Sequence, residues 1–230
     1  IQAQPDQRGI TERYTDEALQ FINKNQTRPF FLYLAHMYVH VPLFVPQQFL
    51  ERSNNGAYGG AVECIDWSMG ILMDQLEQLG LSDSTLIVFT SDNGSRARDE
   101  GGSNQPCRGT KSTTWEGGQR VPCIMRWPNE IASGTVSEAL VTSMDFFPTF
   151  SKLAGESVST ERIIDGNDIS GLMFDETNSM GNDVFHYYAQ NTLEAIRVGD
   201  WKLHFRKGDT EIFELYNLRN DVSETTNRYS

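Results

Sequence analysis

Apolar residues recur with the period of an α-helix in two stretches of the first third of the chain. Over residues 11–25 the apolar positions are three or four residues apart, and Thr11 precedes them as a candidate N-cap. The same spacing returns over residues 58–79, and Gly80 then supplies a stop signal. We therefore predict one helix in each stretch.

Two continuous apolar runs alternate with these helices. The run FFLYLA covers residues 30–35, and the run STLIVFTS covers residues 84–91. A strand that is apolar on both faces is typical of a sheet covered on both sides, as in parallel α/β proteins. The order helix, strand, helix, strand predicts a doubly wound sheet, which binds its ligands at the carboxyl ends of the strands.

In the second half of the chain the predicted elements are shorter, and the last ones are antiparallel strands. VPCIMRWP, residues 121–128, predicts another short strand, and a helix is expected over residues 145–153 with Asp145 as its cap and Gly155 at its end. Alternating segments nearer the C-terminus predict antiparallel strands with a turn at Gly199-Asp200. These segments are residues 183–189, 193–206 and 211–218.

This pattern predicts the domain organisation. We expect residues 1–155 to form the later part of an α/β domain, residues 156–183 to connect, and residues 184–230 to form a small antiparallel β subdomain. The chain opens with neither an initiator Met nor a basic targeting segment, so we expect sequence upstream of Ile1.

Charge and composition exclude some classes of protein. The formal net charge of −12 argues against a nucleic-acid partner, because binding to phosphate backbones depends on clustered Lys and Arg. The most apolar window, residues 29–46, carries two histidines and three prolines, so we interpret it as a strand entering a loop rather than a membrane span.

The cysteines and the glycosylation sequons bear on the compartment. Cys64, Cys107 and Cys123 are too few and too scattered for a disulfide framework, and no two of them form a C-x-x-C pair. Two Asn-x-Ser/Thr sequons, at Asn25 and Asn93, are compatible with a secretory compartment.

Candidate chemistry begins where the second apolar run ends. Asp92 and Asn93 place a carboxylate and an amide oxygen side by side, a pair suited to a hard cation such as calcium or magnesium. Two oxygens are only part of the six to eight that calcium takes. The alternative is an Asx turn that merely ends the strand.

Two further polar residues are candidates for anion binding. Lys111 lies in a glycine-rich loop, where backbone and ammonium could together approach a sulfate or phosphate oxygen. His40 follows the first apolar run and could bind an anion or donate a proton to a leaving group. A solvated lysine and a packed histidine are the alternatives. We expect the remaining histidines, His36, His186 and His204, to be structural.

Seven segments in series resemble type I sulfatases, most closely the arylsulfatase and steryl-sulfatase group. They are TERYTDEALQFI, FLYLAHMYVHVPLF, STLIVFTSDNG, GTKSTTWEGGQRVPCIMRWP, MDFFPTFSKLAG, RIIDGNDISGLM and LYNLRNDVSE. The resemblance covers nearly the whole chain, but only the later part of a full-length sulfatase. It implies an alkaline-phosphatase-like doubly wound sheet, present here in part.

The resemblance also implies roles for individual residues. Asp92 and Asn93 match the second pair of calcium ligands, with Mg²⁺ as the second choice of cation. Lys111 matches the lysine that contacts the sulfate and the leaving-group oxygen, and His40 matches the histidine that contacts the sulfate ester. Arg120 matches a recurring arginine that we interpret as structural.

One part of the sulfatase pattern is missing. Sulfatases use a formylglycine made from the Cys or Ser of a C/S-x-P/A-x-R motif, and none of the three cysteines stands in such a motif. The early Asp-Asp calcium pair and a lysine-histidine segment are missing too. The resemblance therefore implies that formylglycine lies outside this chain, in a missing N-terminal half that is its expected partner.

Three functions remain open. We favour a calcium-dependent sulfuric ester hydrolase of the secretory pathway, lysosome, periplasm or extracellular space, which acts on a sulfate ester only with its N-terminal half. The second is a phospho- or phosphonate-ester hydrolase of the same superfamily. The third is a non-catalytic remnant that binds sulfate. We expect no nucleic-acid partner and no membrane span in this chain.

Overall fold

The computed structural model describes residues 6–159, 161–175 and 181–229. The chain divides into two compact units, each of which is described by itself. The first unit consists of Ile1–Leu86 and Ala97–Ser103, and the second consists of Ile87–Arg96 and Asn104–Ser230.

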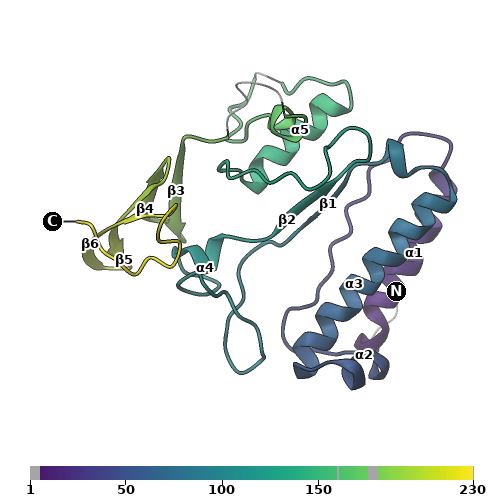
Figure 1. Ribbon diagram of the computed structural model, residues 1–230, viewed down its shortest axis with the longest axis horizontal. Coiled ribbons are helices and arrows are strands. Elements are labelled where there is room, and N and C mark those ends of the chain that lie inside the picture. Colours follow the sequence, from purple (N-terminus) through teal and green to yellow (C-terminus); the bar gives the residue numbers. More distant parts are fainter. Residues whose placement is uncertain (1–5, 160, 176–180, 230) are drawn as a thin grey trace. The chain divides into compact units, whose positions relative to one another are not determined.

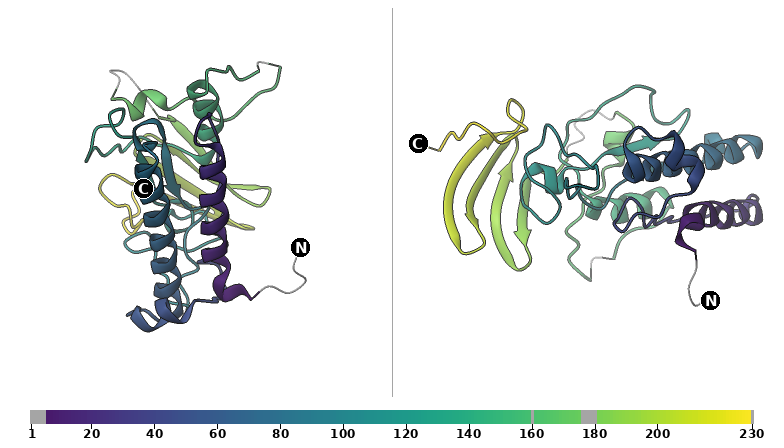
Figure 2. Two further views of the ribbon diagram at one scale, coloured as in Figure 1. Left: turned by 90° about the vertical axis from the view of Figure 1, so that its right-hand side faces the viewer. Right: turned by 90° about the horizontal axis from the view of Figure 1, so that it is seen from below.

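The first unit is helical. Helix α1 (Ile10–Asn25) lies alongside the long helix α3 (Gly56–Gln78), with the short helix α2 (Gln47–Arg52) packed on α3 (Figures 1 and 2). The hydroxyls of Thr15 and Ser68, both fully buried, lie 2.6 Å apart across the contact between α1 and α3. Both predicted helices are confirmed.

The start of α1 differs from the prediction. Thr11 is buried inside the helix and does not cap it, because a 3-10 turn at Gln7–Gly9 leads directly into the first residue, Ile10. The predicted stop of α3 is confirmed: Gly80 has a φ of +68°, and the N–H of Leu81 donates to the carbonyl of Leu76 at 2.8 Å.

The predicted strand over residues 30–35 is wrong for the described residues. This segment pairs with no other strand among them, and the side chains of Phe31 and Tyr33 are 70% and 81% exposed. An apolar run becomes a strand only when a neighbour completes its backbone hydrogen bonds. None of the described helices is both long enough and apolar enough to cross a membrane.

The sequon at Asn25 is not free to carry a glycan in this structure. The Asn25 amide nitrogen donates to the Phe21 carbonyl at 2.7 Å, and its oxygen accepts two hydrogen bonds from Arg28. The residue is 5% exposed. This sequon therefore gives no support to a secretory compartment.

The second unit begins with a two-stranded sheet. Strand β1 (Ile87–Thr90) pairs with β2 (Cys123–Arg126), with Ile87 opposite Arg126 and Thr90 opposite Cys123. Both predicted strands are confirmed. They run antiparallel, and the part of the chain that the structure describes contains no parallel pair.

The described residues of this unit also form the short α-helices α4 (Glu116–Gln119), α5 (Phe146–Leu153) and α6 (Ser170–Met173). The helix predicted over residues 145–153 is confirmed as α5, but the Asp145 side chain forms no capping hydrogen bond with it. Asp145, fully buried, accepts hydrogen bonds from the backbone N–H groups of Thr142 at 2.6 Å and Asn167 at 2.8 Å. This carboxylate therefore holds together segments on both sides of α5.

The C-terminal antiparallel sheet is confirmed. Its four strands follow one another in order: β3 (Val184–Ala189), β4 (Thr192–Val198), β5 (Trp201–Lys207) and β6 (Thr210–Asn217). Figure 2 shows them side by side. Gly199, between β4 and β5, has a φ of +56°, as the predicted turn requires. The predicted division into domains stays a prediction, and residues 160 and 176–180 of the connecting segment lie outside the described residues.

On β5 two polar side chains are buried and an apolar side chain is exposed, the reverse of the usual pattern of a surface strand. Lys202 and His204 point to the buried face and are 0% exposed. Trp201, which begins the strand and lies on the other face, is 46% exposed. The charged face of β5 is therefore the one that packs against the rest of the unit.

Candidate functional site

Asp92 and Asn93 follow β1 after one intervening residue, Ser91. Asp92 is exposed and Asn93 is half-buried, and among the described residues neither side chain forms a hydrogen bond or ion pair. The Ser91 hydroxyl donates instead to the Asn93 backbone carbonyl at 3.0 Å. The Asx-turn alternative therefore finds no support, and both side-chain oxygens are available to a ligand.

Gly94 brings this turn into close contact with the loop that carries Lys111. The N–H of Gly94 donates to the Gly118 carbonyl at 3.1 Å. A Cβ atom at Gly94 would lie 1.9 Å from the Gly117 carbonyl oxygen, far inside van der Waals contact. Only glycine fits at this position, because any side chain would separate the two backbones.

Lys111 is held against the same turn through its backbone. Its N–H donates to the Ser95 carbonyl at 2.9 Å. Asn104 accepts from the Ser95 N–H at 2.7 Å and donates to the carbonyls of Ser95 and Gly109, at 2.8 and 3.1 Å. Within the described residues the Lys111 ammonium has no hydrogen-bond or ion-pair partner, so its charge is uncompensated.

His40 belongs to the first unit. The ring is exposed, and its Nδ1 donates to the Val41 carbonyl at 2.7 Å, which makes Nε2 the acceptor when the ring is neutral. The structure thus assembles Asp92, Asn93 and Lys111 within one unit, while the role of His40 stays a prediction.

The oxygen donors of Asp92 and Asn93 fit the expected calcium ion only in part. In the described ranges no group of three or more His, Cys, Asp or Glu side chains is placed to hold a metal ion. The free oxygens of Asp92 and Asn93 have the right chemistry for calcium but form only part of its usual shell. These two residues therefore fit one side of a calcium site whose remaining ligands come from elsewhere.

The cysteines do not offer a nucleophile. Cys64, Cys107 and Cys123 are all free thiols. Burial raises the pKa of Cys64 to about 11 and also raises that of Cys107, so little thiolate forms on either at neutral pH.

The base of the Lys111 loop is fixed by a cluster of buried charges, which we call the polar junction: Glu116, Lys202, His204 and Glu224. The Lys202 ammonium lies 2.8 Å from a Glu116 oxygen and 3.2 Å from a Glu224 oxygen. The other Glu224 oxygen accepts the backbone N–H of Glu116 at 2.7 Å. Glu224 therefore binds both the loop and the sheet.

The protonation state of His204 follows from its partners. The Lys207 ammonium, which can only donate, lies 2.8 Å from Nδ1, so Nε2 carries the proton and donates to Glu224 at 2.6 Å. Burial lowers the pKa of His204, and the charges of Lys202 and Lys207 lower it further. Burial alone would raise the pKa of Glu224, but hydrogen bonds from His204 and the Lys202 charge outweigh it and lower the pKa.

Aromatic and hydroxyl contacts extend the polar junction. Trp115 packs on His204 with ring centroids 4.0 Å apart, and the Arg108 guanidinium lies 3.7 Å from the centroid of Trp115. Thr114 donates to Glu194 of β4 at 2.7 Å. Three consecutive loop side chains, Thr114, Trp115 and Glu116, thus all attach to the C-terminal sheet.

Arg120 contacts Glu116, and its structural role stays a prediction. Its backbone N–H donates to the Glu116 carbonyl at 2.7 Å, and its guanidinium lies 3.8 Å from the Glu116 carboxylate. It adds positive charge beside a buried carboxylate.

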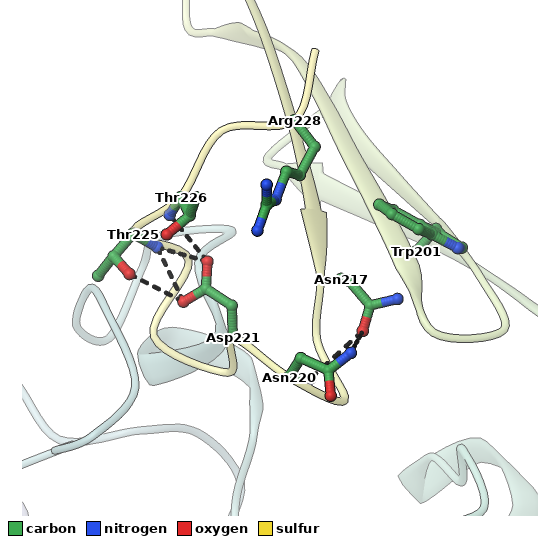
Figure 3. A pocket seen from close by; sticks show the side chains of 7 residues that line it. All are labelled: Trp201, Asn217, Asn220, Asp221, Thr225, Thr226 and Arg228. Carbon is green, nitrogen blue, oxygen red and sulfur yellow. Dashed lines mark hydrogen bonds between the residues drawn. The ribbon is translucent and has the colours of Figure 1, made fainter.

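A separate depression of about 500 Å³ lies over β5, β6 and the segment after β6 (Figure 3). Its lining residues are Trp201, Asn217, Asn220, Asp221, Thr225, Thr226 and Arg228. The Asp221 carboxylate is already occupied by the backbone N–H groups of Thr225 and Thr226, at 3.0 and 2.8 Å. No residue predicted for the chemistry lines this depression.

Comparison with known proteins agrees with this geometry. The structure has the alkaline-phosphatase-like α/β fold of its solved neighbours, among them the PsFucS1 sulfatase from Pseudoalteromonas sp.. That similarity has a TM-score of 0.88 at 27% identity and covers 96% of this chain and 48% of the other. The sulfatase profile matches residues 2–156, and the profile of the N-sulphoglucosamine sulphohydrolase C-terminal region matches residues 110–230. The chain belongs to the sulfatase family.

Curated relatives include two mouse enzymes. The chain is 40% identical to steryl-sulfatase of Mus musculus over 84% of its own length and 32% of that protein's. It is 44% identical to N-acetylgalactosamine-6-sulfatase of Mus musculus over 85% of its own length and 38% of that protein's. The chain thus spans about a third of the length of the curated relatives that it matches.

The close backbone contact at Gly94 predicts that replacing this glycine by alanine destabilises the protein. We expect Gly94→Ala to separate the Asp92–Asn93 turn from the Lys111 loop and to lower the free energy of unfolding by about 2 kcal/mol or more. Gly70→Ala is the control, because a Cβ there meets no atom within 4 Å and alanine favours a helix. Urea unfolding measures both, and a Gly94→Ala protein as stable as wild type would contradict the contact.

The polar junction predicts acid sensitivity. The folded-state pKa of His204 lies below the unfolded value of 6.5 and that of Glu224 below 4.5, so the unfolded chain binds more protons as the pH falls. Stability should therefore be present above about pH 7 and fall through the His204 range, by at most about 1.4 kcal/mol per pH unit for that one group.

This acid sensitivity can be assigned to His204 by substitution. In urea unfolding between pH 7.5 and 5.5, His204→Phe should show a shallower dependence of the unfolding free energy on pH than wild type. If the unfolding free energy depended on pH equally in the two proteins, His204 would not be the source of the acid sensitivity.

Proposed function

We propose that this chain is the later part of a calcium-dependent sulfuric ester hydrolase, in which it supplies Lys111 for the sulfate and Asp92 and Asn93 for the cation. One observation carries the proposal: two backbone hydrogen bonds, Lys111 to Ser95 and Gly94 to Gly118, hold an unpaired ammonium and two free oxygen donors together. Membership of the sulfatase family supports the choice of sulfate esters.

Each residue has a distinct role in the proposed reaction. Lys111 binds a sulfate oxygen and neutralises the charge that develops on the leaving oxygen. Asp92 and Asn93 hold the calcium ion, which when bound would polarise the sulfate group. By the family resemblance, His40 would donate a proton from Nε2 to the departing ester oxygen, which then leaves as an alcohol, while its Nδ1 donates to the Val41 carbonyl.

The proposed enzyme needs a nucleophile from outside this chain. The family nucleophile, formylglycine, would come from the missing N-terminal half, as would the other calcium ligands. A secreted, lysosomal, periplasmic or extracellular location belongs to the same proposal, by analogy with related sulfatases. The names of these relatives, steryl-sulfatase and N-acetylgalactosamine-6-sulfatase, suggest sulfated steroids and sulfated amino sugars as substrates to test.

Substitution of two second-unit residues, Lys111 and Asp92, tests the function. In the complete enzyme, Lys111→Ala should lower kcat/KM for an aryl sulfate by about 100-fold or more, because a preorganised charge is lost at the leaving oxygen. Asp92→Ala should in addition weaken calcium binding, measured by titration calorimetry. Lys24→Ala, in the last turn of α1, is the control and should match wild type.

The same assay separates the alternatives. Faster hydrolysis of an aryl phosphodiester than of the aryl sulfate would favour the phosphoesterase. Binding of sulfate without hydrolysis of either ester by the complete protein would favour the non-catalytic remnant. Full activity of Lys111→Ala would contradict the assigned role of Lys111.

A further inference from the structure

We propose that the polar junction is a positioning device: Glu116, Lys202, His204 and Glu224 set the place of Lys111 without touching the substrate. The inference deepens the proposed function and rests on it. It concerns four residues that lie outside the predicted site and that the sequence pattern would assign to ordinary structural roles.

Two further side chains of the Lys111 loop reach the sheet: Thr114 donates to Glu194 at 2.7 Å, and Arg108 donates to the Tyr216 hydroxyl at 3.3 Å. Helix α4 is four residues long, and Gly117 and Gly118 contribute no side chains to it. Polar and aromatic side chains make the attachment instead: Glu116 binds Lys202 and the Tyr187 hydroxyl, and Trp115 packs on His204. The place of the loop therefore depends on directional contacts rather than on a broad apolar surface.

Buried ion pairs are an unusual way to hold a loop. Desolvation of the charges largely cancels their attraction, so well-packed apolar residues would often give equal or greater stability. The ion pairs instead fix the position of the loop on the sheet, because hydrogen bonds of fixed length and direction allow only one arrangement. Lys202 at 2.8 Å from Glu116 and 3.2 Å from Glu224 fixes the loop in one register on β5.

The geometry is transmitted to Lys111 over a short path. The Thr113 hydroxyl donates to the Thr110 carbonyl at 2.7 Å and accepts the Thr110 N–H at 3.2 Å, which closes a tight turn around Lys111. The N–H of Gly117 donates to the Arg108 carbonyl at 2.7 Å and closes the loop at its base. A shift of Glu116 therefore moves the whole closed loop, including Lys111.

A double-mutant cycle tests this in the complete enzyme. Lys202→Met removes both ion pairs at nearly constant volume and should lower kcat/KM for the aryl sulfate by about 100-fold, because misplacement of about 1 Å has that effect. If Lys202 acts through Lys111, adding Lys111→Ala should cause little further loss. Multiplied losses would overturn the proposal, since independent sites are additive in free energy.

Controls separate positioning from general destabilisation. Arg219→Met breaks an ion pair of 2.9 Å with Asp200 on the same subdomain, away from the loop, and should leave kcat/KM within about two-fold of wild type. If Lys202→Met fails to fold, Lys202→Met/Glu116→Gln carries the same test, because it leaves one fewer unpaired carboxylate buried.

Hydrogen exchange tests the positioning without an activity assay. The amides of Lys111 and Gly117 should exchange at least about ten-fold faster in Lys202→Met than in Arg219→Met. If exchange is faster in Lys202→Met but the wild-type enzyme hydrolyses no sulfate ester, the positioning proposal stands and the proposed function is rejected. Unchanged exchange in an active enzyme would reject the positioning alone.

Discussion

The second unit depends on one carboxylate that is shared between its parts. Glu224, from the segment after the last strand, accepts the backbone N–H of Glu116 and lies against Lys202 and His204 of β5. A buried carboxylate is tolerable only with such a set of partners. Once Glu224 is bound, the Glu116 loop, the strand β5 and the C-terminal segment can occupy only one arrangement.

The position of the Glu116 loop in turn determines the backbone contacts of the candidate site. The loop fixed at Glu116 presents the Gly118 carbonyl to Gly94 and the Lys111 N–H to the Ser95 carbonyl. These two backbone contacts define where the unpaired ammonium lies relative to the free oxygens of Asp92 and Asn93. The residues proposed to bind calcium and sulfate are therefore exposed or half-buried, whereas the residues of the polar junction that position them are buried.

Elements with strong local signals could be predicted from the sequence. The 3.6-residue period predicted α1 and α3, glycines marked the end of α3 and the turn at Gly199, and alternation predicted the C-terminal strands. The segment around Phe31 failed because a strand is defined by its neighbour, and composition does not show whether the neighbour is there. Likewise, the orientation of β5 could not be predicted, since alternation alone would have placed Lys202 and His204 in solvent. Their burial depends on two carboxylates distant in sequence.

The central claim is that the polar junction determines where the Lys111 loop lies. It is tested most directly by crystal structures of the wild-type and Lys202→Met proteins, superimposed on strands β3 to β6. The account predicts that the four strands coincide while residues 110–118 move and the hydrogen bond from Lys111 to Ser95 lengthens or breaks. A loop that keeps its place with that hydrogen bond intact would contradict the account.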